Sequence, residues 1–260
     1  MSTAHTGVRD LFSLEGRVAL VTGASRGLGQ GLALALAEAG ADVALVDRSG
    51  APQTVRQVEA LGRRVVAVQC DLLTADAAEL GRVVTEVTGE LGRLDVLVNN
   101  AGTIRRGPAI DFTEVDWDDV LHVNLRSAFF LSQAAARVMR EAGGGRIINI
   151  ASMLSFQGGV FVPSYTAAKS ALAGVTRALA NEWAPLGINV NAIAPGYMAT
   201  DNTAPLRADA ARSAAIVDRI PAGRWGTPGD LAGAAVFLAS DASAYVHGAV
   251  LPVDGGWLAR

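Results

Sequence analysis

Short runs of consecutive apolar residues recur along the chain and alternate with longer segments in which apolar residues repeat at helical spacing. Uninterrupted apolar runs rich in valine, isoleucine and leucine are typical of strands that are buried on both faces. We therefore predict strands over residues 17–22, 42–47, 64–71, 94–98, 146–150, 189–194 and 249–253. Helices are predicted over residues 28–39, 75–90, 116–140, 165–180 and 227–239.

Strands that alternate with helices form mostly parallel sheets, because each crossover is right-handed and places its helix against one face. The chain is therefore predicted to be an α/β protein with a doubly wound, mostly parallel, seven-stranded sheet and helices on both faces. No linker rich in proline or serine divides the sequence. We predict a mobile N-terminal segment over residues 1–14 and a single domain over residues 15–260.

The residues that follow the predicted strands are the first candidates for function, since ligands of such sheets bind beyond the carboxyl ends of the strands. Chemically distinctive residues stand at these ends, namely Gly23, Asp47, Asp71, Asn99, Ser152 and Pro195. Packing alone does not explain why they collect at one edge of one sheet.

A glycine loop, Gly23-Ala-Ser-Arg-Gly-Leu-Gly29, connects the first predicted strand to the first predicted helix. Glycines allow a tight turn, and the backbone N–H groups at a helix N-terminus attract a phosphate group. The order of strand, glycine loop and helix predicts a dinucleotide site. Its expected contacts are Gly23, Ser25, Arg26, Gly27, Leu28 and Gly29.

Asp47 ends the second predicted strand and bears on the choice between NAD and NADP. A carboxylate there can accept hydrogen bonds from ribose hydroxyls and repel a 2′-phosphate, which favours NAD. Arg26 and Arg48 favour NADP, because each could pair with a 2′-phosphate, although Arg48 could equally be a solvated loop charge. We predict NAD as the cofactor and keep NADP as the alternative.

Further cofactor contacts are predicted at the next strand ends. Asp71 could accept a hydrogen bond from the adenine amine, with Leu72 beside it, although a turn or a helix cap is an equally good explanation of Asp71. Small residues in Asn99-Asn-Ala101-Gly102 would let a flat ligand approach the backbone closely.

Tyr165 and Lys169 are four positions apart on the predicted helix that begins near Pro163, so their side chains share a face. An ammonium group beside a phenol favours the phenolate, so we expect Lys169 to lower the pKa of Tyr165 from about 10. Lys169 is the single lysine among 22 basic residues. Tyr165 is therefore a candidate acid/base, and a chance Tyr-x-x-x-Lys on an amphipathic helix is the alternative.

Asn124 lies in the middle of a predicted helix, where asparagine is unfavourable because its side chain competes for backbone hydrogen bonds. We expect that it either bends the helix through a local hydrogen bond or holds a water molecule near Lys169.

Composition limits the classes of function. The formal net charge of −3 and the pI near 5.6 argue against nucleic acid or an anionic membrane as a partner. Lacking a long apolar run or a signal peptide, the chain is expected to be soluble and cytoplasmic. Cys70 is the only cysteine, and His5, His122 and His247 are widely spaced, so we predict no metal site.

Taken together, these motifs resemble the short-chain dehydrogenase/reductase family. The resemblance covers nearly the whole chain and implies a Rossmann fold, a homotetramer and an NAD(P)-dependent oxidoreductase that interconverts a secondary alcohol and a ketone. The segments that carry it are the glycine loop, Asn99-Asn-Ala-Gly102, Asn124, Ser152, Tyr165-x-x-x-Lys169 and Pro195-Gly196.

The resemblance also implies individual roles. Tyr165 would be the acid/base, Ser152 would hold the substrate carbonyl, and Lys169 would lower the pKa of Tyr165 and bind the nicotinamide ribose. Asn124 would anchor the water of a proton relay. Around the nicotinamide, the implied contacts are Tyr165, Lys169, Pro195, Gly196, Met198 and Thr200.

Other segments resemble the family members that act on deoxy sugar acids, at residues 11–16, 104–106, 149–158, 180–183, 194–200, 220–226 and 253–260. A sugar acid needs a cation for its carboxylate, and Arg105 or Arg106 could offer a bidentate one. Gln157, Tyr197 and Asn202 are plausible partners for its hydroxyl groups, next to Ser152 and Tyr165. For Arg105, Arg106, Gln157, Tyr197 and Asn202, a role in the surface or in loop packing is the alternative.

Two other functions remain open at this stage. One is a 3-oxoacyl carrier-protein reductase or other broad carbonyl reductase, which would prefer NADPH and present a basic surface to its carrier. The other is a nucleotide-sensing module without catalysis, which the presence of Ser152, Tyr165 and Lys169 argues against.

Overall fold

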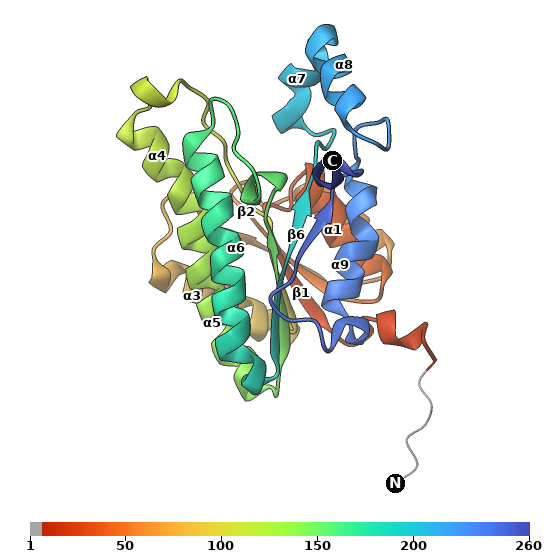
Figure 1. Ribbon diagram of the computed structural model, residues 1–260. Coiled ribbons are helices and arrows are strands. Elements are labelled where there is room, and N and C mark those ends of the chain that lie inside the picture. Colours follow the sequence, from red (N-terminus) through yellow and green to blue (C-terminus); the bar gives the residue numbers. More distant parts are fainter. Residues whose placement is uncertain (1–6) are drawn as a thin grey trace.

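The computed structural model describes residues 7–260, which form a seven-stranded sheet with helices on both faces (Figure 1). The strands are β1 (Val18–Thr22), β2 (Asp42–Asp47), β3 (Val65–Gln69), β4 (Val96–Asn99), β5 (Gly145–Ile150), β6 (Ile188–Pro195) and β7 (Val250–Val253). They lie in the order β3-β2-β1-β4-β5-β6-β7, and every pair is parallel. The predicted fold class is therefore confirmed, and the strand order reverses between β1 and β4, where a ligand crevice is expected.

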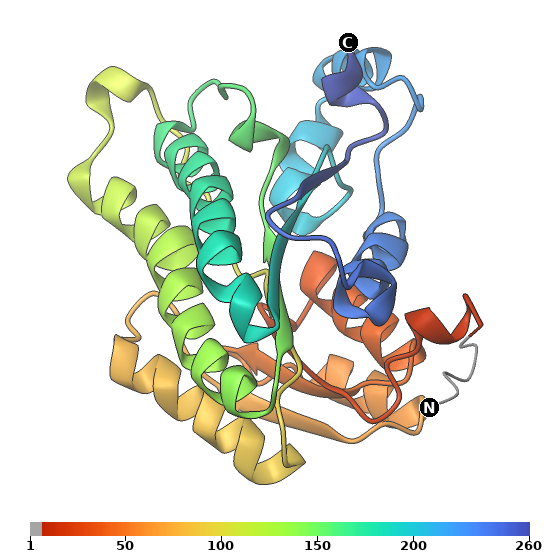
Figure 2. The same cartoon turned by 60° about the horizontal axis from the view of Figure 1, so that its bottom comes forward.

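The helices form one layer on each face of the sheet. One layer contains α1 (Gly27–Glu38), α2 (Pro52–Ala60) and α9 (Ala232–Ala239), and the other contains α3 (Ala77–Leu91), α4 (Glu114–Leu121), α5 (Ser127–Glu141) and α6 (Pro163–Trp183). Figure 2 shows α3, α5 and α6 side by side on their face. Two short helices, α7 (Ala204–Ala208) and α8 (Ala210–Arg219), stand above the carboxyl ends of the strands (Figure 1).

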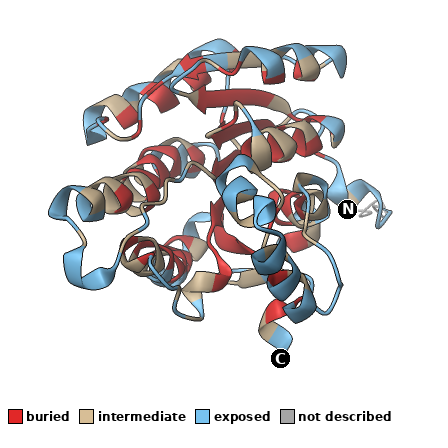
Figure 3. Ribbon diagram, turned by 90° about the horizontal axis from the view of Figure 1, so that it is seen from above, coloured by how far each residue is buried: buried red, intermediate tan, exposed pale blue. Residues whose placement is uncertain are grey.

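Burial follows this layering. All residues of β1 and β6 are buried, and the inward faces of the helices join them in one apolar cluster on each side of the sheet (Figure 3). Edge strand β3 is only partly buried. Unbroken apolar runs occur in central strands, which are covered on both faces, and also in the edge strand β3.

Some predicted elements differ from the observed ones. Residues 116–140 do not form one α-helix, because a π-helical turn at His122–Arg126 separates α4 from α5. The predicted helix 227–239 begins with a 3-10 turn at Pro228–Leu231. Helices α2, α7 and α8 were not predicted, and each buries at most two residues.

The predicted N-terminal segment falls partly outside the described residues, since residues 1–6 are not described. From Gly7 onward the chain forms a 3-10 turn at Asp10–Phe12, and Leu14 is fully buried. Its N–H donates to the carbonyl O of Ala39 at 2.8 Å. Leu14 therefore belongs to the core, and mobility of residues 1–6 stays a prediction.

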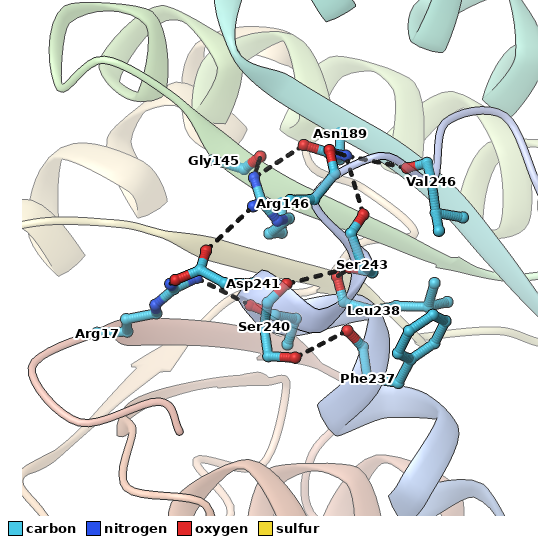
Figure 4. Close-up of polar contacts among 12 residues, drawn as sticks. Arg17, Gly145, Arg146, Asn189, Phe237, Leu238, Ser240, Asp241, Ser243 and Val246 are labelled. Atoms are coloured by element: carbon cyan, nitrogen blue, oxygen red, sulfur yellow. Dashed lines mark hydrogen bonds and ion pairs between the residues drawn. The ribbon is translucent and has the colours of Figure 1, made fainter. Parts of the chain in front are cut away.

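An ionic network closes the amino edge of the sheet (Figure 4). Asp241, just after α9, contacts Arg17 Nη2 at 2.6 Å and Arg146 Nη2 at 3.4 Å. Arg146 Nη1 donates to Asn189 Oδ1 at 2.8 Å, and Asn189 Nδ2 donates to the carbonyl O of Val246 at 2.9 Å. These contacts tie the starts of β1, β5 and β6 to the segment that leads to β7.

Of the helices described, none is long and apolar enough to cross a membrane. Within residues 7–260, no three His, Cys, Asp or Glu side chains are grouped so that they could hold a metal ion.

Candidate functional site

The glycine loop between β1 and α1 leaves no room for a side chain at Gly23 or Gly29. Gly23 has a φ of +64°, and a Cβ there would lie 2.9 Å from Ala101 Cα. A Cβ on Gly29 would lie 2.1 Å from the carbonyl O of Gly23. Helix α1 begins at Gly27, so the N–H groups of its first turn have no acceptor within the helix. This cradle fits the pyrophosphate of a dinucleotide.

Asn100 and Thr22 hold the loops after β1 and β4 together. Asn100 Nδ2 donates to the carbonyl O of Thr22 at 2.8 Å, and Thr22 Oγ1 accepts from the N–H groups of Asn100 at 3.0 Å and Ala101 at 2.9 Å. Neither residue was given an individual role from the sequence alone. The signal that could have identified them is that both are polar and stand at the ends of neighbouring strands.

Asp47 lies at the end of β2, as predicted. Its carboxylate accepts from Ser49 N at 2.9 Å, from Ser49 Oγ at 2.6 Å and from Ser25 N at 3.3 Å. Partial burial alone would raise the pKa of Asp47, but the hydrogen bonds from Ser49 and Ser25 outweigh it and hold the pKa below its usual value. Asp47 is therefore ionised at neutral pH and suited to accept from ribose hydroxyls.

The two arginines predicted near the nucleotide differ in their contacts. Arg26 Nη1 lies 3.2 Å from Asp201 Oδ2, and both side chains are exposed. The exposed Arg48 makes only a backbone contact, in which its carbonyl O accepts from Gln69 Nε2. The structure thus shows a specific partner for Arg26 and none for the Arg48 guanidinium among residues 7–260.

Asp71 forms a turn. Its Oδ1 accepts from Leu73 N at 3.0 Å, which matches the turn alternative, and its side chain is exposed. Leu72 beside it is buried.

Asn99 lies at the end of β4, and its side chain faces the interior. Its Nδ2 donates to Asn149 Oδ1 at 2.8 Å and to Ser132 Oγ at 2.9 Å. Asn149 Nδ2 in turn donates to Thr176 Oγ1 at 2.9 Å. A buried amide must satisfy its donors, and this network does so while joining β4 to β5, α5 and α6. Close approach of a cofactor to the backbone of this loop stays a prediction.

Ser152, Tyr165 and Lys169 come together where β5 ends and α6 begins. Helix α6 starts at Pro163, as predicted. The Ser152 hydroxyl interacts with the Tyr165 phenol and acts to lower its pKa. Ser152 Oγ accepts from Leu154 N at 3.1 Å. Lys169 is 3% exposed. Its Nζ donates to the carbonyl O of Ile150 at 2.6 Å and lies 5.7 Å from the Tyr165 ring centroid.

The pKa of Tyr165 differs from the expected one. Burial raises the pKa of Tyr165 above its usual value, and the interaction with the Ser152 hydroxyl and the positive charge of Arg106 offset part of this rise. Burial also lowers the pKa of Lys169 to about 8. The pKa of Tyr165 thus lies on the opposite side of its usual value from the one expected, and Lys169 is not among the groups that offset the rise. Its ammonium lies over the ring and bonds to Ile150, and loss of hydration dominates at both groups.

Asn124 lies in the π-helical turn and is 1% exposed. Its Nδ2 donates to the carbonyl O of Thr103 at 2.9 Å, and its Oδ1 accepts from Thr103 N at 2.8 Å. Gly102 packs against it, since a Cβ there would lie 3.4 Å from Asn124 Oδ1. The helix is distorted at Asn124, as one alternative expected, but its side chain bonds to the distant Thr103 and not locally. Such turns occur often at functional sites. A bound water at Asn124 stays a prediction.

Only one of the two predicted substrate arginines is placed near Tyr165. Arg105 is committed elsewhere, with Nη2 at 2.9 Å from Asp119 Oδ2 and Nε at 3.3 Å from Asp116 Oδ1. Arg106 Nη2 donates to the carbonyl O of Asn202 at 3.3 Å, and its charge acts on Tyr165. Arg106 is therefore the candidate anion partner, and Arg105 serves to hold its loop against α4.

Two of the other predicted substrate residues, Gln157 and Tyr197, contact Trp257, which was not identified from the sequence. Trp257 Nε1 donates to Gln157 Oε1 at 3.3 Å, and the Trp257 ring packs edge-on against Tyr197 at 4.8 Å between centroids. Trp225 contacts the other side of Tyr197. Asn202 is exposed and is joined to Arg106 through its backbone.

The segment after β6 returns to the glycine loop. A Cβ on Gly196 would lie 2.7 Å from Asp254 Cα, so this turn after Pro195 packs tightly against the end of β7. Met198 is buried, and a Cβ on Gly27 would lie 3.8 Å from Thr200 Cγ2. Residues 195–200 thus close one side of the crevice, where contacts with a nicotinamide ring were expected.

The chain is similar to known proteins in both sequence and structure. The family model described as "Enoyl-(Acyl carrier protein) reductase" matches residues 23–258. The 2-dehydro-3-deoxy-D-gluconate 5-dehydrogenases of Escherichia coli and Dickeya dadantii are 59% and 57% identical, over 96% and 97% of this chain and 98% and 100% of theirs. A crystal structure from Agrobacterium tumefaciens with bound NADP, provisionally assigned as a 2-deoxy-D-gluconate 3-dehydrogenase, is 54% identical with a TM-score of 0.90, covering 96% of this chain and all of that one.

Proposed function

The chain belongs to the short-chain dehydrogenase/reductase family, and from this premise we propose that it is a 2-dehydro-3-deoxy-D-gluconate 5-dehydrogenase. As a member of this family it is an NAD(P)-dependent dehydrogenase acting on CH–OH groups. The observation that carries the substrate is the identity of 59% over nearly the full length of the Escherichia coli enzyme. Arg106 beside Tyr165 supports it, because a sugar acid brings a carboxylate to the group that reacts.

We propose that Tyr165 takes the proton of the substrate hydroxyl during oxidation and returns it during reduction. Ser152, whose hydroxyl interacts with the Tyr165 phenol, holds the same substrate oxygen. A bound nicotinamide supplies the hydride acceptor or donor. The buried Lys169 binds the ribose and adds positive charge near the phenol, and Asn124 fixes the loop after β4 beside it.

The raised pKa of Tyr165 sets the preferred direction at low pH. With its proton in place, Tyr165 can donate to a carbonyl oxygen and so supports reduction. Oxidation needs the phenolate, which the charges of Arg106 and Lys169 stabilise once substrate and cofactor exclude water. The neutral phenol of Tyr165 thus serves proton transfer, whereas the ionised carboxylate of Asp47 serves nucleotide binding.

For the cofactor we propose NAD, with NADP accepted less well. The ionised Asp47 supports NAD, because a carboxylate repels a 2′-phosphate. Arg26 and the NADP bound in the Agrobacterium tumefaciens structure favour NADP. The homotetramer implied by the family resemblance and the cytoplasmic location expected from the sequence pattern stay predictions, the first of which analytical ultracentrifugation would test.

Steady-state rates would test the substrate. The kcat/KM would be measured for 2-dehydro-3-deoxy-D-gluconate and D-gluconate in oxidation and for acetoacetyl thioester in reduction, each with both cofactors. The proposal expects the highest kcat/KM for the deoxy sugar acid. A higher value for the thioester would replace it with a carrier-protein reductase, and absence of turnover with all three would favour a nucleotide-sensing role.

A further inference from the structure

A short turn at Asp201–Thr203 lies beside the glycine loop and is fixed internally. Thr203 Oγ1 accepts from Thr200 N at 3.1 Å and donates to the carbonyl O of Met198 at 2.6 Å. Thr200 lies close to Gly27, as described above. The position of the Asp201 carboxylate relative to the glycine loop is therefore set by the fold.

Two residues of this turn contact two arginines to which anionic groups are proposed to bind. Asp201 Oδ2 pairs with Arg26 Nη1 at 3.2 Å, and the carbonyl O of Asn202 accepts from Arg106 Nη2 at 3.3 Å. Arg26 stands between Ser25, whose N–H donates to Asp47, and Gly27, which adjoins Thr200. The backbone of Arg26 thus adjoins the residue that contacts Asp47, and its guanidinium pairs with the turn at Asp201.

We propose that Asp201 is a specificity-determining residue that disfavours NADP by pairing with Arg26. A 2′-phosphate near Asp47 would need the Arg26 guanidinium as its counter-charge, and Asp201 competes for that guanidinium. NAD carries no 2′-phosphate and leaves the pair intact. The inference rests on the proposed nucleotide site, but not on the proposed substrate.

The size of the effect follows from exposure. The Arg26 and Asp201 side chains are 72% and 73% exposed, so the pair is hydrated and screened by salt. An exposed ion pair of this kind changes an equilibrium by roughly two- to fivefold. Asp201 thus adjusts the preference between the two cofactors and does not exclude either one.

Direct binding of NADH and NADPH tests the proposal, with dissociation constants taken from nucleotide fluorescence at low and high salt. Asp201→Asn should tighten NADPH about two- to fivefold at low salt and leave NADH unchanged, and the gain should shrink at high salt. Asp218→Asn removes an exposed carboxylate from α8 and serves as the matched control, which should alter neither constant. In an Arg26→Gln background, Asp201→Asn should have no further effect on NADPH.

Several results would overturn the proposal. Equal changes for NADH and NADPH would mean that Asp201 only shapes the turn, and a gain that persists without Arg26 would mean that Arg26 is not its target. An unchanged NADPH constant in Asp201→Asn would remove the competition altogether. Because these constants need no sugar acid, failure here is distinguishable from failure of the proposed substrate.

Discussion

The amino edge of the sheet and the pair Lys169 and Arg106 at its carboxyl edge hold their cations in different ways. At the amino edge, Asp241 pairs with both Arg17 and Arg146 (Figure 4). There too, Asp95 Oδ1 pairs with Arg93 Nη2 at 2.7 Å. At the carboxyl edge, Lys169 and Arg106 donate only to backbone carbonyl groups. A carbonyl group is a weaker partner for a cation than a carboxylate is, so these two cations remain available to an anionic or polar ligand.

This difference separates stability from chemistry on one scaffold. Charges that neutralise one another fix the ends of strands, and they gain nothing when a ligand arrives. Charges without a carboxylate partner are poorly compensated in the free protein, which agrees with the lowered pKa of Lys169. The comparison predicts that substitutions at the carboxyl edge change catalysis and that those at the amino edge change the free energy of unfolding.

The largest effect is expected for Tyr165→Phe. Removing the hydroxyl should lower kcat by roughly 10²- to 10⁴-fold, because proton transfer loses its acid/base, while nucleotide binding is retained. Steady-state kinetics and NADH titration measure the two quantities. Tyr245→Phe is the matched control, since Tyr245 is 99% exposed and should leave kcat unchanged. Near-normal turnover of Tyr165→Phe would show that another group transfers the proton.

The next largest effect is expected on the KM for the sugar acid, and it should differ between Arg106 and Arg105. Arg106→Ala should raise the KM for 2-dehydro-3-deoxy-D-gluconate by about 10- to 100-fold, as expected for losing a hydrogen bond to a charged group. Arg105→Ala should change KM much less, because Asp116 and Asp119 already occupy that guanidinium. The pattern would be contradicted if Arg105→Ala produced the greater rise in KM.

At the amino edge, Asp241→Asn should lower the free energy of unfolding by about 1–2 kcal/mol, because it leaves Arg17 and Arg146 without their shared counter-charge. Urea denaturation measures this change. The kcat should remain that of the unaltered protein, and a large loss of kcat would mean that the two edges are not functionally separate.

The smallest effect is expected in the dependence of kcat/KM on pH. The kcat/KM for oxidation should rise with pH, because oxidation needs the Tyr165 phenolate and burial raises the pKa of this group. Reduction should show the opposite slope. Arg106→Ala should move the oxidation profile to higher pH, since removing a nearby positive charge disfavours the phenolate. A profile unchanged by Arg106→Ala would show that its charge does not reach Tyr165.

Sequence reasoning succeeded where a local pattern decides the structure. The apolar runs identified all the strands, and the glycine loop and Asp47 were placed correctly at the ends of β1 and β2. These features depend on residues that are close in sequence, so no knowledge of the tertiary structure was needed.

The remaining features depend on contacts between distant residues. The partners of Asn99 lie on β5 and α5, and those of Arg105 lie on α4. The directions in which the Asn99 and Arg105 side chains point cannot be predicted from periodicity. The pKa of Tyr165 likewise depends on how much water the folded site excludes.

The buried position of Lys169 gives the protein a built-in reporter. Because no other side chain of this sequence is a primary amine, any acylated lysine found after digestion must come from one site. With its pKa near 8, that amine is partly uncharged and reactive at mild alkaline pH, yet its 3% exposure shields it in the folded state. The yield of labelled peptide therefore measures how accessible Lys169 is to the reagent, and a bound dinucleotide should slow the labelling.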